Sequence, residues 1–217
     1  NVVIYRVPKK MSIISPASHC FQCKKRIPYK YNIPILGYYL LNGKCAFCDH
    51  TIASRYPFVE LITALLTIIV YVVFGFNTQF IIYLILTYLL ISVTFVDIDH
   101  FIIPNGFVLF GIFILAGSHF FKFVPIEWQE SVSGAFVFAG FLFGIGLIGQ
   151  FILKKESIGF GDVKLGLVLG GFLGVEYSIL ALYLSFAISA IFIFIMLGGK
   201  LMEKNAKVVI VGGGVVG

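Results

Sequence analysis

The sequence predicts an all-α protein that crosses a membrane several times, with about six transmembrane helices and a small cysteine-containing module before them. Hydrophobic residues make up 59% of the 217 positions, charged residues only 12%, and the mean hydropathy is +1.02. A soluble domain is about one quarter charged, so this chain lacks the polar groups to cover a globular surface. The composition also changes at Pro57, because all four cysteines precede it and long apolar runs follow it.

The lengths of these apolar runs decide which of them can cross a bilayer. A helix needs about 20 residues, with a range of roughly 17–25, to span the hydrocarbon. Four runs meet that length and one is shorter. Another is very short but rich in glycine, so it either packs closely inside the bundle or is re-entrant. In chain order the runs are 58–76, 79–96, 106–121, 134–153, 165–175 and 177–198. A further span is expected before Asn1, where the sequence reads like the end of an apolar helix.

Positive charge sets the expected orientation. Residues 1–57 carry nine Lys or Arg and a single acid, Asp49. Basic loops stay on the cytoplasmic side of a membrane, so we expect this segment inside the cell. Alternating spans then bring Asp97 and Asp162 back to the same face. Nucleic-acid binding is the less favoured explanation of the basic charge, because basic segments are common wherever charge sets orientation.

The four cysteines form two pairs, Cys20-x-x-Cys23 and Cys45-x-x-Cys48, with 21 residues between them. This spacing is typical of zinc knuckles, in which each tight turn supplies two thiolates to one tetrahedral site. Four thiolates leave no position for water, so we expect a structural zinc ion. A redox pair and unligated cysteines are the alternatives. A disulfide is disfavoured in a reducing cytoplasmic loop.

Aspartates stand where apolar runs end or begin. Asp97 and Asp99 close one run, and Asp162 opens another. Ionisable groups beside hydrocarbon are costly and are kept mostly for transport, proton relays or catalysis. Two neighbouring carboxylates share a proton, so one can activate water while the other polarises a peptide carbonyl, as in an aspartic protease. The alternative is that these acids are solvated helix-end residues, with Asp162 at the start of a helix and favoured by its dipole.

Several longer motifs follow one another along the chain. They are "NVVIYRVP", the two CxxC pairs, "YNIPILGYYLLNGKCAFC", "SRYPFVELITALL", "VDIDHFIIPN" and "GFGDVKLG". In this order, over about residues 1–175, the chain resembles the type IV prepilin peptidases, the leader peptidases of type IV pili and type II secretion. That family is similar to other intramembrane aspartyl proteases in having Gly-x-Gly-Asp before its second catalytic acid, here residues 159–162. The turn at residues 103–105 assigns the first acid to Asp97 rather than Asp99.

The resemblance implies a membrane aspartic endopeptidase of the bacterial inner membrane, with its active site at the cytoplasmic face. It would remove the short basic leader of prepilins or pseudopilins and then methylate the new N-terminus with S-adenosylmethionine. Implied partners are these substrates, the lipid bilayer and the pilus or secretion machinery. The implied catalytic acids are Asp97 and Asp162, with Gly159, Gly161, Asp99 and Lys164 in support. Glu60 would contribute to methyl transfer or orient the cysteine module, unless it is simply a helix-start acid.

The residues also allow two other functions. One is a more general intramembrane aspartyl protease with another substrate. The other is a transporter or assembly scaffold carrying the zinc module. A transporter should pair acids with bases in mid-membrane, whereas these acids lie at one interface, which favours the protease.

The expected organisation is a basic module at residues 1–57, a helical membrane domain at 58–200 and a tail at 201–217. The tail departs from the family, which would have a Pro-Phe-Gly-Pro run and another apolar helix there. It reads "KNAKVVIVGGGVVG" instead. The tail contains Gly-x-Gly-x-x-Gly, but a dinucleotide site needs that loop to open a helix within a βαβ unit of about 30 residues. An apolar chain end is therefore the favoured interpretation.

Overall fold

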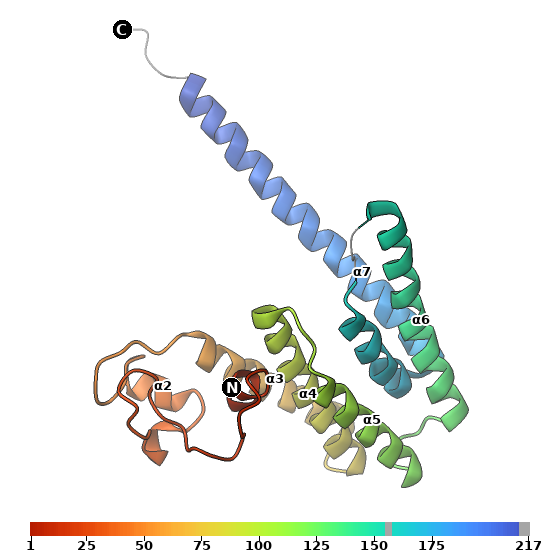
Figure 1. Ribbon diagram of the computed structural model, residues 1–217, viewed down its shortest axis with the longest axis horizontal. Helices are drawn as coiled ribbons and strands as arrows, with labels where there is room; N and C mark the ends of the chain where they lie inside the picture. The colour runs from red at the N-terminus through yellow and green to blue at the C-terminus, as the bar shows by residue number, and fades with distance from the viewer. Residues whose placement is uncertain (155–157, 213–217) are drawn as a thin grey trace.

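The computed structural model describes residues 1–154 and 158–212, without side chains at residue 153 or after Ile195. The described chain is helical apart from its N-terminal module, where two isolated β-bridges occur. The elements are α1 (Val2–Arg6), a short 3-10 helix (Tyr29–Tyr31), α2 (Leu36–Leu40), α3 (Arg55–Phe74), α4 (Thr78–His100), α5 (Asn105–Phe120), α6 (Trp128–Leu153) and α7 (Phe160–Gly212) (Figure 1). The predicted Gly-x-Gly-x-x-Gly loop falls largely on residues 213–217, outside the described part of the chain.

Within the described residues, four helices are long and apolar enough to cross a membrane: α3, α4, α6 and α7. Helix α5 is apolar but has only 16 residues. At about 1.5 Å per residue it is roughly 24 Å long, less than the hydrocarbon thickness of about 30 Å. The predicted count of about six spans is therefore not confirmed, although the helical membrane class is.

The predicted runs 165–175 and 177–198 lie in a single element, α7, which is broken at one residue. Gly174 has φ 69° and ψ −174°, a conformation that glycine adopts without the penalty that a Cβ brings. A Cβ at Gly174 would also lie 2.9 Å from a carboxylate oxygen of Glu130 on α6. Both constraints require glycine here, so α7 consists of two helices joined at this break.

The outer surfaces of helices α3, α5 and α7 are apolar. Val72 on α3 is 74% exposed, Phe113 on α5 is 72% exposed and Ile188 on α7 is 65% exposed. Lipid tails are as apolar as these side chains, so such a surface is stable in a bilayer and unfavourable in water. The protein is therefore a membrane protein.

Helix α4 lies at the centre of the packed interior. Its residues Val93 and Val96 are buried, and they belong to one apolar cluster with Val59 of α3, Val108 of α5 and Val168 of α7. Helix α1 also packs on α4, and α6 packs along α7. Figure 1 shows the C-terminal part of α7 extending away from the other helices. This packing brings the C-terminal end of α4 towards the start of α7.

Candidate functional site

Asp97 lies in the last turn of α4, just before a sharp change of direction. The helix ends at His100, and the next residue, Phe101, adopts a left-handed conformation with φ 53°. Its backbone N–H donates to the carbonyl of Asp97 at 2.7 Å. The chain then passes through Ile103 and Pro104 into α5, with Pro104 at the N-cap because it has no N–H to leave unpaired.

Asp162 lies in the first turn of α7, directly after two closely spaced glycines. Its backbone N–H donates to the carbonyl of Gly159 at 3.0 Å. A Cβ on Gly159 would lie 3.2 Å from the Asp162 carboxylate, and a Cβ on Gly161 would lie 3.0 Å from the Cβ of Ile103. The second glycine thus permits the close approach between the start of α7 and the loop that follows Asp97.

A hydrogen bond also links the two segments. The Nζ atom of Lys164 on α7 donates to Oδ1 of Asn105 at the start of α5, at 3.0 Å. Asp97 and Asp162 lie close enough for their carboxylates to interact electrostatically. The structure therefore brings together two acids that are far apart in the sequence, with Gly161 and Lys164 at the contact. Two carboxylates that approach each other closely can share one proton, because two like charges at close range cannot both ionise readily.

Asp99 has a different environment from Asp97. Two residues along a helix correspond to a rotation of about 200°, so the two side chains leave α4 on opposite sides. Asp99 forms an ion pair with Arg55, the first residue of α3. This ion pair is not predicted by the sequence, because the two residues are 44 positions apart and Arg55 is one of nine basic residues in the N-terminal segment. Acids beside a membrane commonly pair with bases. This rule was the only indication in the sequence that Asp99 would have a basic partner.

The four cysteines meet in one cluster. Their sulfur atoms all lie within 4.8 Å of one another, and all four cysteines are free thiols. Cys20 Sγ is 3.7 Å from Cys48 Sγ, and Cys23 Sγ is 4.0 Å from Cys45 Sγ. Each Cys-x-x-Cys turn is closed by an antiparallel bridge, His19 with Arg26 and Lys44 with Thr51. The cluster is compact enough to bind a metal ion.

Backbone hydrogen bonds prepare the cluster to carry negative charge. The N–H of Cys23 donates to the sulfur of Cys20 and lowers the pKa of Cys20 to about 6. At Cys48 the N–H of His50 acts in the same direction, but burial and the neighbouring thiol groups outweigh it and raise the pKa to about 12. The thiols therefore lose their protons in steps, and a cation at the centre would favour full ionisation.

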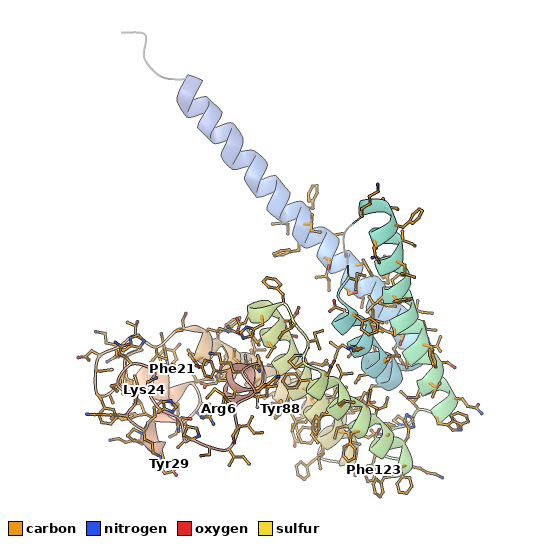
Figure 2. All side chains as sticks on the ribbon, viewed as in Figure 1. Arg6, Phe21, Lys24, Tyr29, Tyr88 and Phe123 are labelled. Carbon is orange, nitrogen blue, oxygen red and sulfur yellow. The ribbon has the colours of Figure 1, made fainter. Side chains whose placement is uncertain are left out.

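Arg6 and Glu60 hold the N-terminal segment together through hydrogen bonds. Arg6, at the end of α1 and labelled in Figure 2, is buried. Its guanidinium donates to the carbonyls of Ser12 at 2.9 Å and Pro16 at 2.6 Å. These bonds tie α1 to the loop before the first cysteine pair. Glu60, in α3, accepts a hydrogen bond from the backbone N–H of Ile35 at 2.7 Å and from the side chain of Asn1 at 3.0 Å. Its carboxylate therefore holds two parts of the N-terminal segment.

The fold and the two clusters define a class: a helical membrane protein with paired acids at helix ends and a cysteine-clustered module. Two family models match, the bacterial peptidase A24 N-terminal domain over residues 1–74 and the type IV leader peptidase family over residues 84–194. The chain belongs to the type IV leader peptidase family.

Curated relatives cover most of the chain. It is 33% identical to a prepilin leader peptidase/N-methyltransferase of Pseudomonas aeruginosa, over 96% of this chain and 79% of the relative. A Bacillus subtilis protein of the same name is also 33% identical, over 92% and 79%. The type 4 prepilin-like proteins leader peptide-processing enzyme of Escherichia coli O78:H11 is 33% identical, over 80% and 71%. No solved structure matches.

Proposed function

We propose that this protein is a membrane aspartic endopeptidase that removes the leader of type IV prepilins or pseudopilins, with Asp97 and Asp162 as its catalytic acids. The observation that carries the proposal is the approach of the start of α7 to the loop that follows Asp97, where Gly161 contacts Ile103 and Lys164 donates a hydrogen bond to Asn105. The printed names of the relatives support the substrate class.

The proposed reaction needs one proton shared by the two carboxylates. The ionised acid removes a proton from water, and the resulting hydroxide attacks the scissile peptide carbonyl. The protonated acid donates a hydrogen bond to the carbonyl oxygen and stabilises the negative charge that develops there. The intermediate then collapses, the C–N bond breaks, and the leaving amine takes up a proton from an acid. The pair thereby returns to its singly protonated state.

Apolar side chains around the acids support an apolar substrate segment at this site. Ile98 at the end of α4 and Ile102 in the loop after it are exposed, Phe160 is exposed two residues before Asp162, and Phe101 is 87% exposed. The apolar helix of a prepilin would lie in the bilayer against these residues, with its leader outside the hydrocarbon. The basic charge of residues 1–57 supports a cytoplasmic location for this end of the bundle, in the inner membrane of a bacterium.

The metal proposed for the four cysteines is zinc. With Zn–S bonds of about 2.3 Å in a tetrahedron, the sulfurs lie about 3.8 Å apart. The separations of 3.7 and 4.0 Å support this geometry. All four positions would be filled by thiolates, so the ion would serve as a structural element of residues 1–57 and supply no catalytic water. Such a short segment, with few buried apolar residues, gains its order from metal binding.

The proposed second activity is methylation of the new N-terminus with S-adenosylmethionine as the methyl donor. The names of the relatives support it, since they include N-methyltransferase. Glu60 is the candidate acid from the sequence, for transfer or for orientation. Its hydrogen bonds to Ile35 and Asn1 support the orienting role.

The test is cleavage of a purified prepilin in liposomes by the wild type, Asp97→Asn and Asp162→Asn, with Glu127→Gln as the matched acid-to-amide control at the start of α6. Product masses are read with and without S-adenosylmethionine. We expect cleavage by the wild type and Glu127→Gln alone, and an added methyl mass when the donor is present. Cleavage by either aspartate variant at the wild-type rate would exclude the proposed mechanism.

A further inference from the structure

Arg55 stands at the junction between the cysteine module and the membrane helices. The second cysteine turn is closed by the N–H of Cys45, which donates to the carbonyl of His50 at 2.8 Å. The hairpin continues with a bond from the N–H of Ile52 to the carbonyl of Gly43 at 2.7 Å. Only Ala53 and Ser54 separate this hairpin from Arg55, the first residue of α3. Ordering of the cysteine cluster therefore fixes the place from which the arginine side chain starts.

The guanidinium of Arg55 binds the last turn of α4 through three different contacts. One NH₂ group forms the ion pair with Asp99, and the other donates to the backbone carbonyl of Phe95 at 3.1 Å. The guanidinium carbon also lies 5.3 Å from the centre of the Phe95 ring. Phe95 and Asp99 are four residues apart and share one face of α4. A planar group with five donors suits this combination of partners, and an ammonium group does not.

Asp97 lies between these two residues on the opposite side of the helix. Val96 beside it is fully buried, so the turn cannot rotate freely without disturbing the core. Arg55 thus binds one side of the last turn of α4, and Asp97 lies on the opposite side, towards α7. Because the Arg55 and Asp99 side chains are 37% and 30% exposed, their pairing adds little to overall stability. The main effect of the Arg55–Asp99 pair is therefore to orient the last turn of α4.

We propose that Arg55 is a positioning residue, which couples metal binding by the four cysteines to the placement of Asp97. This inference rests on the proposed function for the role of Asp97. The contacts predict that loss of the metal or of the guanidinium loosens the same turn, so the two changes should not add. A structural residue without this role would alter protein stability instead.

The kinetic test compares prepilin cleavage by the wild type, Arg55→Gln, Arg55→Lys, Asp99→Asn and the double variant Arg55→Gln/Asp99→Asn. Lys30→Gln, an exposed base in the same module, is the matched control. We expect kcat to fall on the order of 100-fold in Arg55→Gln, the scale of a misplacement of about 1 Å, with little change in KM. The double variant should be no slower, and Arg55→Lys should recover part of the rate. Wild-type kcat in Arg55→Gln, or losses that multiply in the double variant, would overturn the proposal.

A second measurement does not depend on cleavage. Hydrogen–deuterium exchange at residues 95–101 is followed in the full-length wild type and in Arg55→Gln, with zinc bound and after chelation. We expect chelation or Arg55→Gln to increase exchange in this segment, and chelation of Arg55→Gln to add nothing. Unchanged exchange in either case would refute the coupling, and Asp99→Asn provides the same test if Arg55→Gln does not fold.

The two measurements separate this inference from the proposed function. A wild type that cleaves while Asp97→Asn does not, together with full activity in Arg55→Gln, would refute the inference alone. Coupled exchange in a protein that cleaves no prepilin would refute the proposed function and support the link between the module and α4.

Discussion

The cysteine cluster and the aspartate pair are assembled in different ways. Each half of the cysteine cluster is local, because two thiols lie on one short turn that its own backbone bridge closes. The aspartate pair has no local part: Asp97 and Asp162 belong to helices separated by α5 and α6. A local cluster depends on its ligand and its turns, whereas a distributed pair depends on the packing of several helices. Substitutions should therefore affect the two sites differently.

The largest effect is expected at the acids themselves. Asp97→Asn and Asp162→Asn should each lower the cleavage rate by on the order of 10³-fold or more, because each removes one partner of the proton-sharing pair. The double variant should be no worse than either single variant, since the acids act as one unit. Steady-state cleavage assays with matched circular dichroism spectra would measure this. Asp99→Asn should be milder, and equal or greater loss in that variant would reverse the assignment of the first acid.

Removal of a cysteine should act first on order in the module and, through Arg55, on the last turn of α4. Cys45→Ser should abolish stoichiometric metal binding and make residues 1–54 sensitive to protease, because the segment has little core of its own. The helices from α3 onward should stay resistant to protease, although hydrogen exchange at residues 95–101 should rise. Metal analysis and limited proteolysis read these two results separately. Proteolysis of the long helices at the same rate as the module would show that the module is not an independent unit.

Gly161→Ala should affect the aspartate site by steric contact. The added Cβ would lie 3.0 Å from the Cβ of Ile103 and push α7 away from the loop after Asp97. Overpacking of this kind costs about 1–3 kcal/mol. We expect a clear fall in kcat and a lower melting temperature. Gly140→Ala is the control, because no atom lies within 4 Å of a Cβ built there; an equal loss in that variant would contradict the steric explanation.

The smallest effect is expected from the hydrogen bond between Lys164 and Asn105. Lys164→Met removes the donor while keeping the length of the side chain. Loss of one such bond costs about 0.5–1.5 kcal/mol, so activity should fall by roughly tenfold or less. Asn105→Ala should give a similar loss, and the double variant should show coupling between the two changes. Additive losses in a double-mutant cycle would mean that the bond does not join the two segments in the membrane.

The cysteine cluster, which is built from local turns, could be predicted from the sequence. The aspartate site, which depends on the packing of several helices, could be predicted only in part. The spacing of the cysteines predicted their clustering, because each pair needs a single turn. The Gly-x-Gly-Asp motif pointed to Asp162, but the approach of Gly161 to Ile103 depends on helix packing that no local pattern encodes. Arg55 was missed as a partner of Asp99 for the same reason.

The number of membrane spans was also hard to predict from local patterns alone. Hydropathy located the apolar runs and divided residues 165–198 into the runs 165–175 and 177–198. Hydropathy could not show whether that division ends a span or bends a helix. The short α5 posed the same problem, since a run near the minimum length carries no information about its depth. Backbone geometry at a single glycine is decided by its neighbours on α6, which lie far away in the sequence.

The break at Gly174 also uncouples the motions of the two parts of α7. An unbroken helix would carry twist and bending from its far end back to Asp162, but the interrupted hydrogen-bond ladder absorbs such distortion. The stretch from Phe160 to Gly174 can stay rigid while the later part of α7 moves. A reporter group or a change of bilayer thickness acting on that later part should therefore leave the acids undisturbed, which makes it a convenient handle for attaching probes.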